Sequence, residues 1–274
     1  MALELKGALV LAGAGKMGGA MLTGWLADGL DPRQVLVQDP SPPPEVKALL
    51  DRHRIVASPA LAKPATPPAV LLMAVKPQAM EQVFPALARL AGPETLVLSI
   101  AAGRTIGSFE AHLPPRTAVV RSIPNTPAAI GRGITVCCPN AHVTPAQRRL
   151  CDDLLASVGE VGWVAEERLI DAATAVSGSG PAYVFLLAEC LAEAARAVGL
   201  DDALAKRLAN ATVSGAGELQ RRSGLDPATL RQNVTSPNGT THAALQVLMA
   251  RDGLAPLLTR AVQAADKRSR ELSA

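Results

Sequence analysis

The sequence predicts an α/β protein in which a doubly wound, mostly parallel sheet is followed by an all-helical region. Up to about residue 165, short apolar runs of strand type alternate with stretches whose apolar residues recur at helical spacing. From residue 166 onward the helical spacing continues, alanine is abundant and no convincing strand pattern follows. We therefore divide the chain into a sheet domain, 1–165, and a helical domain, 166–274.

Composition narrows the classes of protein to consider. The chain has 274 residues, 49% of them hydrophobic, and a formal charge of +3. A chain of this length can bury a sizeable core. Its basic residues form no block interleaved with aromatic residues, so we do not expect nucleic-acid binding. Uninterrupted apolar runs such as Ala69–Val75 are much shorter than a membrane span, so we expect no transmembrane helix.

Cysteine and histidine usage indicates neither a metal site nor a disulfide framework. The four cysteines show no CxxC pattern, and the four histidines are scattered. Cys137 and Cys138 are typical of small side chains buried in a strand. The apolar run Ala8–Ala12 leads directly into a glycine turn, which favours a strand over a signal peptide. We expect a reducing, cytoplasmic setting and no metal.

The first element with chemical character is the turn Gly13-Ala14-Gly15-Lys16-Met17-Gly18. It follows the strand-like run Ala8–Ala12 and precedes Ala20–Leu26, which has helical spacing. In such a turn Gly13 permits the sharp bend, Gly15 lets the backbone approach a pyrophosphate and Gly18 lets the helix pack on the strand. This context predicts a Rossmann-type dinucleotide site that includes Lys16 and Met17. A glycine turn of purely structural origin is the alternative.

Asp39 ends the next strand, Gln34–Gln38. An acidic residue about twenty positions beyond the glycine turn is placed to bind the adenosine ribose hydroxyls. Its charge would repel the 2′-phosphate of NADPH. Equally, Asp39 begins the proline-rich turn Asp39–Pro44, where aspartate is a good turn former. The choice between NADH and NADPH therefore stays open.

Other strand ends supply further candidates, because ligands of such sheets lie at the carboxyl ends of the strands. The apolar run Ala69–Val75 ends at Lys76-Pro77, Leu96–Ile100 is followed by small residues that leave room for a flat ring, and Thr117–Arg121 leads to Asn125 between two prolines. We assign the following residues to the cofactor: Ala74, Val75, Lys76, Pro77, Ala101, Ala102, Gly103 and Asn125. Two alternatives to this assignment stay open: that Lys76 is merely solvated, and that Asn125 only caps a turn.

The remaining elements of the first domain follow the same alternation. The pattern predicts a helix over Glu45–His53 and an extended piece at Ile55-Val56, a strand over Ile134–Cys138, a helix over Pro145–Val158 and a final strand at Gly162–Val164.

In the second half, glycines and a proline interrupt the helical pattern between Leu169–Ala175 and a long helix, Ala182–Val198. Pro181 can occupy the first turn of that helix. The apolar surface of Ala182–Val198 is wide enough to be buried against neighbouring helices or another subunit. A further helix is predicted over Asp201–Arg222.

The segment Ser236-Pro237-Asn238-Gly239-Thr240-Thr241 is the second with chemical character. It precedes a predicted helix, His242–Met249, for which Thr240 or Thr241 can serve as the N-cap. Free backbone N–H groups at the start of this helix would hold a small carboxylate. The alternatives are that the threonines only cap and that His242 is a helix-surface residue.

Five stretches together resemble the pyrroline-5-carboxylate reductase family: Gly13–Leu22, Ala74–Pro77, Pro124–Ala128, Ser177–Phe185 and Ser236–Thr241. The resemblance implies a Rossmann domain and a helical domain that forms an intertwined homodimer, often within a ring of five dimers. It also implies hydride transfer from NADPH or NADH to the C=N carbon of the small-molecule substrate 1-pyrroline-5-carboxylate, giving L-proline.

The same resemblance maps the substrate loop onto Ser236, Asn238, Gly239, Thr240 and Thr241. It places Thr241 where a hydroxyl hydrogen-bonds the substrate ring nitrogen, which is chemically sufficient for reduction of an imine. The family usually has glycine where this chain has Asn238. Asparagine tolerates the left-handed backbone that such a position requires.

Two other functions are considered. A β-hydroxyacid dehydrogenase would use a lysine with an asparagine one turn later, a spacing that Lys206 and Asn210 have. These residues lack the preceding glycine-rich stretch, and we interpret Lys206 as solvated. A non-catalytic nucleotide sensor is the second alternative. It would be expected to lack either the glycine turn or the 236–241 loop, and the chain has both.

Overall fold

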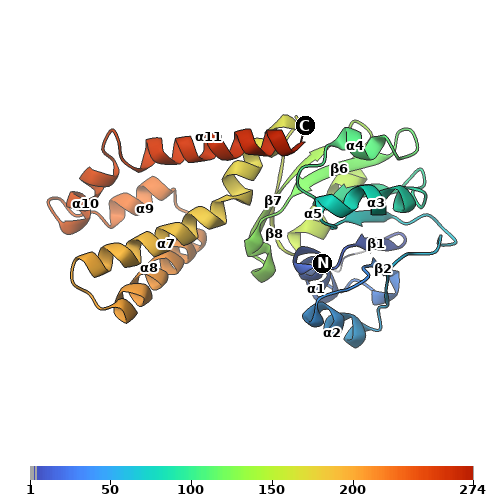
Figure 1. The fold of residues 1–274 in the computed structure, drawn as a ribbon, viewed down its shortest axis with the longest axis horizontal. Coiled ribbons are helices and arrows are strands. Elements are labelled where there is room, and N and C mark those ends of the chain that lie inside the picture. The colour runs from blue at the N-terminus through green and yellow to red at the C-terminus, as the bar shows by residue number, and fades with distance from the viewer. Residues whose placement is uncertain (1–2, 4, 274) are drawn as a thin grey trace. The chain divides into compact units, whose positions relative to one another are not determined.

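A computed structural model describes residue 3 and residues 5–273 of the chain (Figure 1). The chain forms two compact units, Met1–Gly178 with Asp266–Ala274, which we call the sheet unit, and Ser179–Ala265, which we call the helical unit. The predicted division at residues 165 and 166 marks the end of strand-like sequence and stays a prediction about domains. By their contacts, residues 166–178 and the last turns of the chain belong with the sheet.

The sheet unit is built on one eight-stranded sheet with the order β3-β2-β1-β4-β5-β6-β7-β8. The strands are β1 Leu9–Ala12, β2 Val35–Gln38, β3 Ala57–Ser58, β4 Val70–Met73, β5 Leu96–Ser99, β6 Ala118–Ile123, β7 Gly133–Pro139 and β8 Gly159–Trp163. β6 and β7 are antiparallel, and the other neighbours are parallel. The strand order reverses between β1 and β4, where sheets of this kind bind their ligands. The predicted fold class is confirmed.

Helices cover both faces of this sheet. They are α1 Lys16–Ala27, α2 Pro44–His53, α3 Pro77–Ala88, α4 Ile106–Glu110, α5 Pro145–Ala156 and α6 Arg168–Ala173, with single 3₁₀ turns at Pro32–Gln34 and Thr126–Ile130. Alternate residues of β1 enter two separate cores: Leu9 packs with Trp25 and Leu154, and Val10 packs with Phe84. Burial on both faces explains why the central strands are continuously apolar.

One local prediction is wrong: the extended piece expected at Ile55-Val56 falls instead at Ala57–Ser58, which pairs with β2. The predicted interruption before the long helix is present, as a π-helical stretch, Thr174–Gly178, followed by a bend at residue 179. The hydroxyls of Thr174 and Ser177 donate to backbone carbonyls four residues earlier, so side chains replace part of the regular hydrogen bonding.

The helical unit contains α7 Gly180–Ala197, α8 Asp202–Ser223, α9 Pro227–Asn233, α10 Thr240–Leu248 and the first part of α11 Leu254–Ser273. α7 and α8 lie side by side (Figure 1). The short helix α9 was not predicted. It is stabilised by local signals, an N-cap hydrogen bond from the Ala228 N–H to Asp226 and Pro227 in its first turn.

One helical stretch, Arg168–Ala197, is long and apolar enough to cross a membrane when judged by length and composition alone. Its most apolar window has a mean hydropathy of 1.3, and only 11% of that window is buried. This differs from our expectation, which rested on uninterrupted apolar runs. An apolar helix exposed in a single chain also fits one that a second protein chain covers.

Candidate functional site

The glycine turn has the geometry of a phosphate cradle. Gly13 has φ +89°, and a Cβ there would lie 2.7 Å from the Ala74 carbonyl oxygen. Gly15 is the N-cap of α1, and a side chain there would meet open space among the described residues. No side chain in that part of the chain caps α1. Backbone N–H groups at the start of α1 are therefore open toward a ligand, and the turn fits the pyrophosphate of a dinucleotide.

Asp39 connects the end of β2 to this cradle. Its Oδ2 accepts a hydrogen bond from the Ala14 N–H at 2.7 Å, and its Oδ1 accepts one from the Ser41 N–H at 2.8 Å. The bond from Ser41 is the contact expected if Asp39 begins the proline-rich turn, which was the alternative role considered for this residue. The carboxylate lies beside the glycine turn, where an acceptor for ribose hydroxyls belongs. Both interpretations of Asp39 therefore fit the same geometry.

The two neighbouring strand ends are joined by a residue that the sequence analysis missed. Arg104 donates to the Pro77 carbonyl at 3.1 Å and to Glu81 Oε1 at 3.0 Å. It thereby links the 101–103 turn after β5 to the Lys76-Pro77 turn that starts α3. The first of these turns to be reached in the chain, Lys76-Pro77, follows β4, which flanks the switch in strand order, and the 101–103 turn follows the next strand, β5. An arginine directly after a turn of small residues was the available signal.

Asn125 is engaged within the chain. Its Oδ1 accepts from the Ile134 N–H at 2.9 Å, and its Nδ2 donates to the Ser177 carbonyl at 3.1 Å. These bonds connect the end of β6 to β7 and to the π-helical stretch. Asn125 is thus a cross-link as well as a candidate cofactor residue, and its role toward the cofactor stays a prediction.

The 236–241 loop lies within the helical unit. α10 begins at Thr240, and its N-cap is Gly239, so the prediction that a threonine caps this helix is wrong. Asn238 has φ +59°, the left-handed conformation that asparagine tolerates. A Cβ at position 239 would lie 2.5 Å from Ser236 Oγ, so a larger residue there would displace the Ser236 side chain. Among the described residues no side chain caps α10, which leaves its first N–H groups for a carboxylate.

His242 lies in the first turn of α10, and its Nε2 is 3.2 Å from Gln246 Nε2 on the next turn. That is a helix-surface contact.

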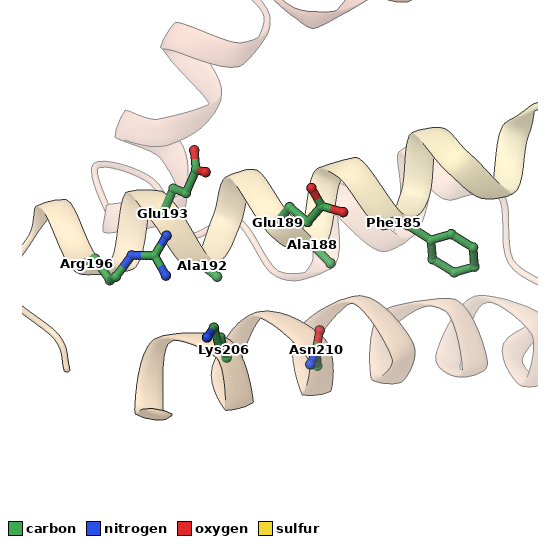
Figure 2. Close-up of a pocket in the computed structure, with 8 residues that line it drawn as sticks. All are labelled: Phe185, Ala188, Glu189, Ala192, Glu193, Arg196, Lys206 and Asn210. Carbon is green, nitrogen blue, oxygen red and sulfur yellow. The ribbon is translucent and has the colours of Figure 1, made fainter. Parts of the chain in front are cut away.

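Lys206 and Asn210 line a hollow of about 370 Å³ in the helical unit (Figure 2). The other lining residues come from α7: Phe185, Ala188, Glu189, Ala192, Glu193 and Arg196. Lys206 is paired with Asp202 at 2.8 Å, and its side chain is 62% exposed. In Figure 2 the carboxylates of Glu189 and Glu193 point away from Lys206. The polar groups do not converge on one point, so Lys206 reads as a solvated ion-pair partner.

The titratable groups of the sheet unit do not point to a metal site or a reactive thiol. Burial raises the pKa of the Cys137 and Cys151 thiols well above the usual range, which keeps both protonated. Among the residues that the structure describes, no group of three or more His, Cys, Asp or Glu side chains could hold a metal ion.

Known proteins give a consistent result along the chain. The family model for NADP oxidoreductases, coenzyme F420-dependent, matches residues 8–103, and that for pyrroline-5-carboxylate reductase dimerisation matches residues 167–272. The chain is 40% identical over 265 residues to the pyrroline-5-carboxylate reductase of Pseudomonas aeruginosa, covering 97% of this chain and 96% of the relative. The chain belongs to the pyrroline-5-carboxylate reductase family.

Solved structures of the pyrroline-5-carboxylate reductase family share the fold. The protein from Coxiella burnetii has a TM-score of 0.91 and 33% identity, covering 98% of this chain and all of that one. The protein from Plasmodium falciparum, solved with NADP bound, has a TM-score of 0.79 and 27% identity, covering 98% and 99% of the two chains. The dimerisation match spans the whole of the apolar stretch Arg168–Ala197.

A buried charged cluster also escaped the sequence analysis. Arg121 on β6 has a side chain only 4% exposed, with Nη1 2.9 Å from Glu167 Oε1 and Nη2 3.6 Å from Asp171 Oδ1. The sequence contained two signals of this cluster: an arginine at the end of an apolar strand, and two carboxylates four residues apart. Nothing local indicated that they would meet.

Proposed function

We propose that this chain reduces 1-pyrroline-5-carboxylate to L-proline with NADH or NADPH. The observation that carries the proposal is its full-length relationship to pyrroline-5-carboxylate reductases, 40% identity over 97% of the chain. The two uncapped helix starts, at α1 and α10, support it by offering anion sites of the kind that a dinucleotide and a small carboxylate need.

The cofactor binds along the carboxyl ends of the strands. The backbone of Gly13–Gly18 would hold the pyrophosphate, and Asp39, which lies beside this turn, would accept from the ribose hydroxyls. The turns at residues 74–77 and 101–103, joined by Arg104, would hold the nicotinamide. Bound NADH or NADPH supplies the hydride, and the protein supplies position and polarity.

The substrate binds at the 236–241 loop. The N–H groups at the start of α10 hold its carboxylate, and the Thr241 hydroxyl hydrogen-bonds the ring nitrogen. As the hydride adds to the imine carbon, the nitrogen takes up a proton through this hydroxyl, which regains one from water. Polarising that nitrogen makes the imine carbon a better hydride acceptor, and fixing the ring removes the orientational part of the barrier. No paired carboxylates or catalytic triad are required for this reaction.

The chain assembles through its helical region, as the dimerisation match indicates. We propose that the assembly is a homodimer that extends to a ring of five dimers, and that it works in the cytoplasm. The exposed apolar residues of α7 support the homodimer, and the free thiols Cys137, Cys138, Cys151 and Cys190 are consistent with a reducing compartment.

The test is the steady-state oxidation of NADH and of NADPH with DL-pyrroline-5-carboxylate by the wild type and Thr241→Ala. We expect turnover by the wild type and a loss of about 100-fold in kcat/KM for Thr241→Ala, the usual scale for a lost proton donor. Thr259→Ala is the matched control, because its hydroxyl donates to the Ala255 carbonyl of its own helix. A wild type that binds cofactor but leaves the imine unchanged would refute the proposal, and 3-hydroxy acids would be screened next.

A further inference from the structure

The last turns of α11 pack against the turn that follows β5. Although α11 begins in the helical unit, its residues from Asp266 onward belong to the sheet unit. Gly103 has φ +67°, and a Cβ there would lie 3.0 Å from the Leu272 carbonyl oxygen. A residue with a side chain at this position would push the helix end away. Glycine therefore allows α11 to lie directly on the 101–103 turn.

A hydroxyl fastens the same helix end to the buried charged cluster. Ser269 Oγ donates to Asp171 Oδ1 at 2.7 Å, across 98 positions in the sequence. Asp171 is 6% exposed, and the same oxygen lies 3.6 Å from Arg121 Nη2. A hydrogen bond to a buried carboxylate is among the stronger ones in proteins. The end of α11 is thus held by a buried carboxyl group and not only by surface contact.

The buried charged cluster also contacts residue 106, just after the 101–103 turn, through Glu167. Arg121 Nη1 lies 2.9 Å from Glu167 Oε1, and that same oxygen accepts the N–H of Ile106 at 2.8 Å. Ile106 is the first residue of α4 and is buried. The 101–106 segment is therefore hydrogen-bonded to Glu167 at Ile106, and the Leu272 carbonyl lies close to it at Gly103. Arg104, between these points, joins it to Pro77.

We infer that Ser269 and Asp171 are positioning residues for the nicotinamide half of the cofactor site. They hold the end of α11 against Gly103, and so maintain the conformation of the 101–106 segment before the cofactor binds. This inference rests on the proposed function for the assignment of residues 101–103 to the cofactor. If the 101–106 segment is already ordered in the free protein, no binding free energy is lost in ordering it when the cofactor binds.

The experiment compares wild type, Ser269→Ala, Ser269→Thr and Arg268→Ala as full-length oligomers. Ser269→Thr keeps the hydroxyl. Arg268→Ala is the matched control on the adjacent position, where the side chain is 66% exposed and pairs with Glu271 on the same helix. For each, the Kd of NADH and of NADPH is measured by fluorescence titration, and kcat and both KM values follow from steady-state kinetics with DL-pyrroline-5-carboxylate.

We expect Ser269→Ala to raise the cofactor Kd and KM on the order of tenfold, the factor that one lost hydrogen bond to a charged group produces. The KM for the imine and the oligomer size should stay at wild-type values, Ser269→Thr should restore cofactor affinity, and Arg268→Ala should leave it unchanged.

Three outcomes would overturn the inference. They are an unchanged cofactor Kd in Ser269→Ala, an equal rise in Kd in Arg268→Ala, and a wild type that binds neither cofactor. Failure of the proposed function is distinguishable, because it leaves cofactor binding intact in the wild type while the imine is not reduced. The binding titrations then still decide the role of Ser269.

Discussion

The sheet unit and the helical unit bury very different amounts of apolar surface. In the sheet unit, two cores on opposite faces of the sheet enclose large side chains such as Trp25, Phe84 and Phe109. Within Ser179–Ala265, all of which the structure describes, the buried hydrophobic residues are three alanines: Ala192, Ala205 and Ala209.

Most of the large apolar residues of the helical unit, by contrast, are exposed in the single chain. Phe185 is 62% exposed and Leu187 is 52% exposed. Full burial of one such side chain contributes about 1.5–3 kcal/mol, and three alanines cannot supply an equivalent core. The sheet unit therefore contains its own stabilising core, whereas the helical unit, which the dimerisation match covers, leaves most of its large apolar side chains uncovered in the single chain. If assembly covers them, as we propose, the stability of the helical unit depends on protein concentration.

The largest effect should come from a charge on the exposed face of α7. We expect Phe185→Asp to dissociate the assembly and abolish reductase activity, since the carboxylate would be buried without a partner at the subunit contact. Analytical ultracentrifugation and the steady-state assay measure the two effects.

Val56→Asp is the matched control for Phe185→Asp, because Val56 is also an exposed apolar residue, 77% exposed, but lies in the sheet unit. It should leave assembly and activity unchanged. Equal dissociation by both variants, or by neither, would contradict the contrast between the two units.

The second largest effect should be a loss of stability of the sheet unit when its buried ion pair is broken. Arg121→Met leaves the carboxylates of Glu167 and Asp171 without their cation, and removal of one partner from a buried ion pair costs about 3–5 kcal/mol. Urea unfolding at a fixed protein concentration would measure the loss. Arg104→Met is the comparison, because its partner Glu81 is 78% exposed and such surface pairs contribute about 0–1 kcal/mol. Equal losses would show that burial of the pair is not what matters.

A smaller effect concerns the choice of cofactor. Asp39→Asn removes the charge beside the glycine turn while keeping one oxygen acceptor. We expect the ratio of kcat/KM for NADPH to that for NADH to rise about tenfold, equivalent to about 1.4 kcal/mol. Asp28→Asn, the same change at the exposed C-cap of α1, should leave the ratio unaltered. An unchanged ratio in Asp39→Asn would mean that Asp39 only holds the turn.

The smallest effect is electrostatic and lies on the surface of α8. Hydrogen bonds from Arg221 and Arg222 lower the pKa of Glu218 from 4.5 to about 2. The folded state therefore binds this proton less tightly than the unfolded chain, and the stabilisation is present above pH 4.5 and is lost as the pH falls toward about 2. Glu218→Gln should lower the Tm slightly at neutral pH. The difference should shrink with added salt and with acid; a difference that grows with acid would contradict this sign.

Turn and backbone conformations set by a few adjacent residues could be predicted from the sequence. The glycine turn lies between strand and helix as its sequence context indicates, and Asn238 adopts a left-handed backbone. The threonine N-cap failed because Thr240 and Thr241 lie one and two positions inside α10, and the Gly239 backbone makes the entry. Here two local signals competed, and the geometry of the turn prevailed over the preference of threonine for the cap.

The sequence by itself determined the fold class and the two loops with chemical character, because hydrophobic period and turn residues act over a few neighbouring positions. Only the tertiary structure decided which distant side chains meet. Arg121 and Glu167 are 46 positions apart, and Ser269 and Asp171 are 98 apart. The exposure of α7 was likewise decided by tertiary structure. The periodicity of a helix shows which face is apolar, but what covers that face depends on how the whole chain, and its partner, pack.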